Sequence, residues 1–196
     1  MFLAQWNGRC EINLDGGESK KRCLPFYDSP PERSSFCENA YATAIASARE
    51  RVHIFTPYFC AGEKLSSALA FAAERGVDVR VIIPHIPDKK YAFSLSKASA
   101  KPLSERGVKF YEYTPGFMHA KSMVCDDRAF IGSYNLDHRS MRLNFECGVM
   151  LDGEIAECAE RDFKDCIRLS SPLNEIKISA WQKLLRFVLK LFAPLM

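Results

Sequence analysis

Helix-like and strand-like segments alternate repeatedly in the first part of this 196-residue chain. Apolar residues recur every three or four positions in the helix-like segments, and they alternate with polar residues or run together in the strand-like ones. Helices are predicted over 35–50, 63–75 and within 88–105, and strands over 52–59, 77–84 and 108–113. A chain that alternates in this way forms a parallel-rich sheet covered by helices on both faces.

Local signals mark where several of these helices begin and end. Ser35 and Glu38 form a capping box, in which the Ser35 hydroxyl is expected to accept a hydrogen bond from the first helical turn. Gly76 and Gly107 follow the second and third helices and are predicted to terminate them.

The pattern changes after Pro115 and Gly116. Three strand-like segments joined by short turns follow, at 119–125, 129–135 and 144–151, so the sheet is expected to be mixed. A last helix is predicted over 153–168. Its apolar stripe consists of Ile155, Cys158, Ala159, Phe163, Cys166 and Ile167.

The length and a hydrophobic content of 47% suffice for one domain with its own core. We expect an irregular N-terminal segment over 1–33, an ordered domain over 34–170 and a basic amphipathic tail over 171–196. The predicted fold class is therefore α/β, with a mixed β-sheet flanked by helices on both faces and a C-terminal amphipathic helix.

The charge and the cysteine content limit which binding partners and which cellular compartment are expected. The net charge of +3 and the pI near 8.4 are too mild to indicate a nucleic-acid binder by themselves, and no nucleic acid is expected as a partner. The eight cysteines form no CxxC pair and no spacing typical of a zinc site. We therefore expect them to be reduced and mostly buried, as in the apolar runs around Cys125 and Cys147. Reduced cysteines in turn predict that the protein faces the cytosol. No metal, no cofactor, no signal peptide and no membrane span are expected.

The most informative stretch, 119–126, reads H-x-K-x4-D, and the sequence GSxN follows shortly after it. Side chains two residues apart project from the same face of a strand. His119 and Lys121 should therefore share one face, and so should Ser133 and Asn135. Two adjacent strands could then present four polar groups to one point.

These groups suit a phosphodiester. His119 can supply a nitrogen nucleophile, while Lys121 and Asn135 can hold the non-bridging oxygens, and this chemistry needs no metal. Glu146 could accept a hydrogen bond from a motif histidine and fix its tautomer. An HxK pair alone is more often a solvated strand edge, so the interpretation depends on the whole combination of residues.

Asp126 completes the motif, which places it in the candidate catalytic set. Its odd spacing from His119 nevertheless directs it to the opposite face of a straight strand. We therefore expect a structural role, either pairing with a base or capping the turn before Arg128.

These residues and the segments around them resemble bacterial cardiolipin synthases, which are two-motif members of the phospholipase D superfamily. The resemblance runs from about Leu24 to Met196 and includes TPYF, RGVDVRVIIPHIPDKKY, GVKFYEYTPGFMHAK and NLDHRSMRLNFECGV. It implies the phospholipase D fold and transfer of a phosphatidyl group between two phosphatidylglycerol molecules, with release of glycerol. It also implies catalytic roles for His119, Lys121 and Asp126, and substrate-binding roles for Ser133, Asn135 and Glu146.

The mechanism that this resemblance implies needs two histidines, one that bonds to phosphorus and one that moves the proton. The other histidines, His53, His85 and His138, stand in no second copy of the motif. Three alternatives stay open: a homodimer, a partner chain that carries the other motif, or an inactive remnant that binds membranes.

The resemblance further implies phosphatidylglycerol, an anionic phospholipid, as partner and a peripheral location on the cytoplasmic side of the cell membrane. The basic tail could lie in the membrane interface or pack on the protein's own core. The rival enzyme is a single-motif phosphodiesterase or nuclease, which would want a basic groove. Tyr58, His138 and Arg139 resemble family positions near the pocket, whereas His85 is expected to carry no chemistry.

Overall fold

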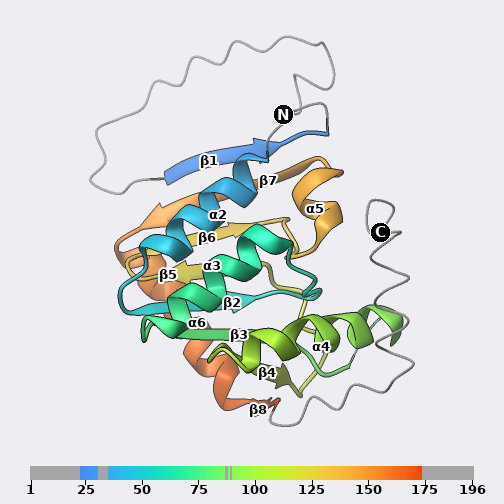
Figure 1. Cartoon of the computed structure of the whole chain (residues 1–196). Coiled ribbons are helices and arrows are strands. Elements are labelled where there is room, and N and C mark those ends of the chain that lie inside the picture. Colours follow the sequence, from blue (N-terminus) through green and yellow to red (C-terminus); the bar gives the residue numbers. More distant parts are fainter. Residues whose placement is uncertain (1–22, 31–34, 87, 89, 174–196) are drawn as a thin grey trace.

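The computed structural model describes residues 23–30, 35–86, 88 and 90–173 (Figure 1). One mixed sheet of eight strands forms its centre, in the order β1-β7-β6-β5-β2-β3-β4-β8. Strands β2, β3 and β4 are parallel to one another and the other neighbours are antiparallel, which confirms the predicted mixed sheet. The strands are β1 (Cys23–Asp28), β2 (Arg51–Phe55), β3 (Asp78–Pro84), β4 (Lys109–Tyr113), β5 (Ser122–Cys125), β6 (Arg128–Gly132), β7 (Glu146–Asp152) and β8 (Ser170–Pro172).

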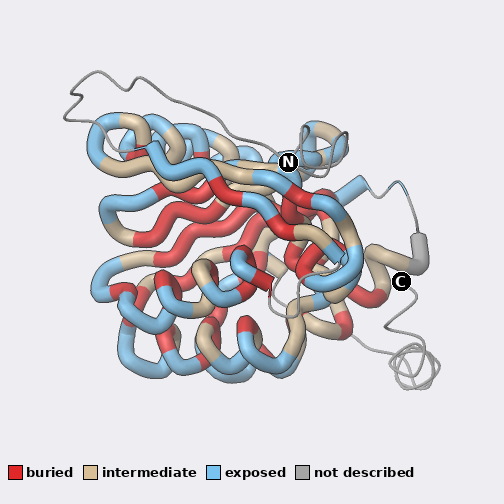
Figure 2. Tube along the Cα trace, turned by 90° about the horizontal axis from the view of Figure 1, so that it is seen from above, coloured by how far each residue is buried: buried red, intermediate tan, exposed pale blue. Residues whose placement is uncertain are grey.

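Helices cover both faces of this sheet, as predicted. α2 (Phe36–Ser47), α3 (Glu63–Glu74) and α4 (Lys90–Ser104) lie side by side on one face (Figure 1). α6 (Glu154–Arg168) lies on the other face, where it contacts β2, β4, β5, β6 and β7. The central strands are consequently buried between two layers (Figure 2). A short helix, α5 (His138–Arg142), connects β6 to β7.

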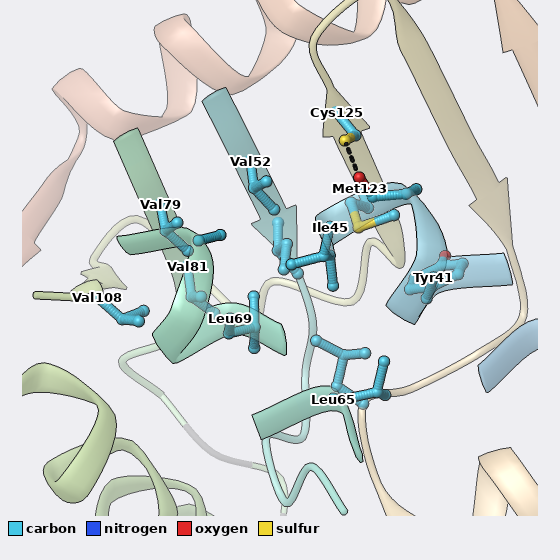
Figure 3. Close-up of a cluster of buried hydrophobic side chains, with 14 of the residues drawn as sticks. Tyr41, Ile45, Val52, Leu65, Leu69, Val79, Val81, Val108, Met123 and Cys125 are labelled. Carbon is cyan, nitrogen blue, oxygen red and sulfur yellow. Dashed lines mark hydrogen bonds between the residues drawn. The ribbon is translucent and has the colours of Figure 1, made fainter. Parts of the chain in front are cut away.

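The larger part of the core lies between the sheet and helices α2 and α3 (Figure 3). Branched aliphatic side chains dominate its strands, where their stiff side chains pack well. Its most enclosed members, none more than 1% exposed, include Ile45, Val52, Leu65, Leu69, Val79, Val81 and Met123. A smaller cluster of Phe55, Ile82 and Phe163 lies beneath α6. Because helices pack on both faces of the sheet, the ends of the central strands are held in fixed positions.

The prediction that 1–33 is irregular is wrong for β1, which forms an edge of the sheet. Phe26 and Asp28 are buried, and they alternate with exposed neighbours. The sequence signal was weak because the strand is short and contains Pro25, which only an edge strand tolerates.

β1 also fixes the start of α2. The Asp28 carboxylate accepts hydrogen bonds from the backbone N–H groups of Phe36 at 2.6 Å and Cys37 at 3.0 Å. The Ser35 hydroxyl donates to Asp28 at 2.7 Å and accepts from the backbone N–H of Glu38 at 3.0 Å, the contact that the capping box predicts. Two acceptors thus satisfy the first turn of α2.

The predicted boundaries shift at other places as well. Gly76 and Gly107, at φ of +90° and +96°, follow α3 and α4 as expected. β8 extends the sheet past the predicted domain end at residue 170, and α5 was not predicted. The predicted amphipathic helix of the tail falls on 174–196, outside the described residues, as do 1–22. Among the described helices, none is long and apolar enough to cross a bilayer.

The cysteines depart from expectation in their burial. The seven described cysteines are free thiols, but only Cys37 and Cys125 are buried. Cys147 and Cys158 are exposed, so the prediction that the cysteines are mostly buried is wrong. Apolar neighbours in sequence did not reveal which face of the sheet or helix each thiol occupies.

The buried face of α6 differs from the predicted stripe because it contains a charge. Cys158 is exposed, whereas Glu160 is only 4% exposed. The Glu160 carboxylate lies 2.8 Å from Nδ1 of the buried His53, whose ring stacks on Phe163 at 4.4 Å between centroids. The contact with His53 of β2 thus explains why an acidic residue is buried between α6 and the sheet.

Candidate active site

The segments that carry the predicted site converge at one edge of the sheet. The parallel strands β2, β3 and β4 end there. β5 is antiparallel to β2 and begins at this edge, because Ser122 pairs with Phe55. β6 ends there and β7 begins there, because Gly132 pairs with Gly148. The residues before β5, after β6 and at the start of β7 therefore become neighbours.

His119 and Lys121 lie in the irregular segment immediately before β5, not inside the strand. Lys121 Nζ lies 3.2 Å from Nε2 and 3.3 Å from Nδ1 of the His119 imidazole, and it donates to the His119 carbonyl oxygen at 2.9 Å. The two side chains thus lie on one side of the chain. The imidazole is exposed, with the Phe117 ring 5.4 Å away between centroids.

Ser133 and Glu146 form the second part of the site. The Ser133 hydroxyl donates a short hydrogen bond to the Glu146 carboxylate and accepts from the backbone N–H of Cys147 at 3.0 Å. Asn144 Nδ2 donates to the other Glu146 oxygen at 3.0 Å. Both carboxylate oxygens of this buried residue are bound to partners other than a histidine, unlike the imidazole contact considered from the sequence.

A carboxylate that the sequence interpretation missed, Asp137, completes the surroundings of Lys121. Burial lowers the pKa of the Lys121 ammonium, while the charges of Glu146 and Asp137 act in the opposite direction. Burial raises the pKa of Asp137, against hydrogen bonds from the Ser140 backbone at 2.7 Å and from the Asn135 side chain. The sequence signal for Asp137 was its position as the N-cap of α5.

Asn135, predicted to hold phosphate oxygens, therefore contacts Asp137. Its buried Oδ1 atom has no hydrogen-bond partner among the described residues. The amide oxygen and nitrogen are assigned from their contacts, so one end of this side chain contacts Asp137 and the other end has no described partner. The structure thus brings Asn135 into the same neighbourhood as Lys121 through Asp137.

Asp126 lies at the opposite end of β5 from His119, so the structure separates it from the other site residues. Seven extended residues correspond to about 20 Å. The Asp126 carboxylate accepts from the backbone N–H groups of Arg49, Glu50 and Arg51 at 2.9, 3.0 and 3.0 Å. These contacts correct the placement of Asp126 in the catalytic set, because it anchors the turn between α2 and β2. A structural role was expected, but the expected partners, a basic side chain or the turn before Arg128, are not the ones that the carboxylate binds.

Residues 41–167 match the family described as cardiolipin synthase, phospholipase D-like domain. The chain belongs to this family. An uncharacterized protein of Streptococcus mutans is 43% identical over 180 residues, covering 88% of this chain and 39% of that protein. Cardiolipin synthase A of Pseudomonas aeruginosa is 36% identical over 180 residues, covering 89% of this chain and 36% of that synthase.

Solved structures share the phospholipase D-like fold. A phospholipase D family member, Nuc, from Salmonella typhimurium superposes with a TM-score of 0.68 at 21% identity, covering 80% of this chain and all of that one. Phosphatidylserine synthase of Haemophilus influenzae gives 0.69 at 18% identity, covering 98% of this chain and 50% of that one. The chain thus spans under two fifths of the two curated relatives above and half of this solved synthase.

Arg139, Tyr58 and His85 have partners outside the contacts of His119 with Lys121 and of Ser133 with Glu146. Arg139 Nε donates to the Asn144 side chain at 3.2 Å, one step from Glu146. The Tyr58 hydroxyl binds Asp88. His85, expected to be a plain loop residue, has its Nδ1 2.8 Å from Glu112, whose other oxygen lies 2.6 Å from the ammonium of Lys97. His85 therefore belongs to an ion-pair cluster at the same sheet edge.

Proposed function

We propose that this chain is one half of a phosphatidyltransferase that joins two phosphatidylglycerol molecules into cardiolipin and releases glycerol. The observation that carries the proposal is the contact of the exposed His119 imidazole with the Lys121 ammonium at a strand end. Such a pair provides a nucleophile and a positive charge beside the same phosphorus. Family membership supports a phosphatidyl group as the group transferred.

In the first step, His119 attacks the phosphorus of the donor lipid, so that an N–P bond forms and the P–O bond to glycerol breaks. The departing oxygen takes a proton from a second histidine. In the second step, that histidine removes a proton from a hydroxyl of the acceptor headgroup, whose oxygen displaces His119 from phosphorus. Lys121 stays protonated and compensates the charge on the non-bridging oxygens throughout.

The second histidine is proposed to come from another HKD motif outside this copy of the chain. His53 is unsuited because it is buried beneath α6 and bound to Glu160. A second copy related by a two-fold axis, or a partner polypeptide with the other motif, can supply it. The homodimer version predicts that specific activity rises with protein concentration.

The proposed substrate resides in a bilayer, so the chain has to meet a membrane surface. We place it as a peripheral protein on the cytoplasmic side, with the basic tail 171–196 in the lipid interface. Sedimentation with phosphatidylglycerol vesicles tests this by comparing the full chain with one that ends at Ser171. Equal binding by both chains would remove the tail from the proposal.

The first prediction concerns the nucleophile. Purified full chain incubated with phosphatidylglycerol should form cardiolipin and an acid-labile phosphoenzyme, both measured by mass spectrometry. His119→Ala should lower both by at least about 10³-fold, because loss of a covalent nucleophile removes the chemical pathway. Asp127→Asn, at an exposed residue, serves as the control.

The outcomes separate the alternatives. Cardiolipin made equally well by His119→Ala would refute the nucleophile. Absence of a phosphoenzyme at every protein concentration would refute the homodimer version, and phosphatidic acid as the sole product would indicate water as acceptor. Nicking of plasmid DNA would support the nuclease alternative instead.

A further inference from the structure

A hollow formed by α2, α3 and α5 has no role in the chemistry described so far. It encloses about 440 Å³, within the size range of small-molecule sites. We propose that it binds the glycerol moiety of the acceptor lipid, an inference that rests on the phosphatidyl transfer proposed above. The side chains that matter for the argument are Glu38, Glu63, Lys64, Ser67, His138 and Arg142.

The hollow adjoins the candidate active site through the connection between β6 and β7. α5 follows β6 and precedes β7 at the sheet edge that carries Ser133 and Glu146, and His138, its first residue, lines the hollow. Arg142, one helical turn further along α5, also lines it. A headgroup held there lies next to the segment that carries the phosphate-binding groups.

The hollow offers both hydrogen-bond acceptors and donors. Glu38 supplies a carboxylate that is only 5% exposed, and Arg142 Nη2 donates to its Oε2 atom at 2.6 Å. On the opposite side α3 begins at Gly62, an N-cap that provides no side-chain acceptor for the first helical turn. The ammonium of Lys64 donates to the Asn39 side chain at 2.5 Å at the same rim.

The balance of charges selects the kind of ligand. Two carboxylates, Glu38 and Glu63, face two cations, Lys64 and Arg142, so the lining is neutral overall. A free phosphate would meet the carboxylates, and a choline or ethanolamine headgroup would meet the cations. Neighbouring hydroxyl groups both donate and accept hydrogen bonds, so a neutral diol satisfies both kinds of partner.

His138 adds an unsatisfied polar atom to this lining. Its Nδ1 atom is enclosed and has no hydrogen-bond partner in the described part of the chain. An enclosed nitrogen without a partner is unfavourable. A ligand hydroxyl can supply the partner once the imidazole turns toward the hollow, so ligand binding should be visible at this ring.

Nuclear magnetic resonance of the ¹⁵N-histidine-labelled full chain tests the proposal directly. Glycerol and dihexanoylphosphatidylglycerol should shift the His138 ring signals in a saturable way, whereas dihexanoylphosphatidylcholine and inorganic phosphate should not. A shift with the lipid but not with free glycerol would place the recognition in the rest of the lipid and overturn the glycerol assignment. A phosphate shift as large as that with glycerol, or no shift with any probe, would also overturn it.

Variants link the hollow to the ligand. Ser67→Phe fills the space without removing a charge and should abolish the glycerol-dependent shift, and Glu38→Gln should weaken the apparent affinity at least tenfold. Glu74→Gln is the matched control, since Glu74 forms a 2.7 Å ion pair with Arg106 elsewhere on the surface. Unchanged binding in Ser67→Phe, with thermal melting like the parent, would refute the site even if Glu38→Gln fails to fold.

The phosphoenzyme separates this inference from the proposed function. If both hold, Ser67→Phe still forms the His119 phosphoenzyme but makes at least tenfold less cardiolipin at low phosphatidylglycerol. Glycerol binding without any phosphoenzyme would retain the hollow and refute the transferase. Cardiolipin formation at the parent rate by a Ser67→Phe chain would retain the transferase and refute the hollow.

Discussion

At the scale of single residues, Lys121 is held where burial and charge oppose one another. Removal of its ammonium from water lowers its pKa, and the Glu146 and Asp137 carboxylates counteract part of that effect. A partly desolvated ammonium interacts more strongly with phosphate oxygens than a fully hydrated one. Burial also raises the pKa of Asp137, which makes the negative charge of this carboxylate less favourable than it would be in water.

The charge on Lys121 therefore depends on Glu146. Glu146→Gln removes a charge that raises the Lys121 pKa, so this pKa should fall further, and the ammonium should be lost at a lower pH than in the parent protein. Carbon-13 titration of reductively methylated lysines measures it. Glu74→Gln should leave Lys121 unchanged, and a Lys121 titration that is the same in Glu146→Gln would contradict the assigned neighbourhood.

Asp126 is predicted to stabilise the fold in a pH-dependent way. Burial opposes its ionisation, but hydrogen bonds from the backbone of Arg51, Arg49 and Glu50 outweigh it and lower its pKa. The stability it contributes is therefore present above its unfolded pKa of about 4 and is lost as the pH falls through the lower folded pKa. Asp126→Asn should cost about 1–2 kcal/mol at pH 7.

Urea unfolding at a series of pH values measures this difference. The gap between Asp126→Asn and the parent should narrow below about pH 4. Asparagine also tolerates the left-handed backbone of this residue, which has a φ of +52°, so the substitution tests the charge and its hydrogen bonds. Asp127→Asn provides the exposed control, and a pH-independent gap would contradict the ionic explanation.

At the scale of elements, the contact of β6 with β7 sets the position of Ser133. A Cβ atom on Gly132 would lie 2.5 Å from the Cys147 carbonyl oxygen and 2.8 Å from Gly148 Cα. Gly132→Ala should therefore push the strands apart, with a stability loss of about 3 kcal/mol and loss of the Ser133 contact with Glu146. Gly116→Ala, where nothing lies within 4 Å of the new Cβ, is the control for denaturant unfolding.

The central elements could be predicted from the sequence because their apolar periodicity continues over enough residues. The edge strands β1 and β8 and the short α5 have too few buried positions for such a pattern. Periodicity also marked the apolar part of β5 but not its start, which is why His119 was expected inside the strand.

The positions of the candidate site residues could be predicted only where they depend on the local geometry of the chain. Spacing by two residues sufficed to place Lys121 beside His119. The pairing of Ser133 with Glu146 depends on the register between β6 and β7, which no local pattern specifies. Asp137 was missed because its helix is only five residues long.

At the scale of the whole molecule, the sheet should lose its hydrogen bonds from its edges inward. β1 and β8 each have one described neighbouring strand, whereas β2 lies between β3 and β5 and is covered on both faces. Amide hydrogen exchange measured by mass spectrometry should be slowest for β2 and β3 and fastest for the two edge strands. Protection of β1 equal to that of β3 would show that another chain or segment covers that edge.

The short length of β5 explains the spacing between Lys121 and Asp126 in the motif. The four unspecified residues between Lys121 and Asp126 are the strand itself, Ser122–Cys125. The motif therefore spans the length of one strand, with the His119 imidazole at one edge of the sheet and the Asp126 carboxylate at the other. One residue inserted into β5 would turn the side chains at one end of the strand to the opposite face of the sheet. A chain that keeps both His119 and Asp126 in place therefore has to keep four residues between Lys121 and Asp126.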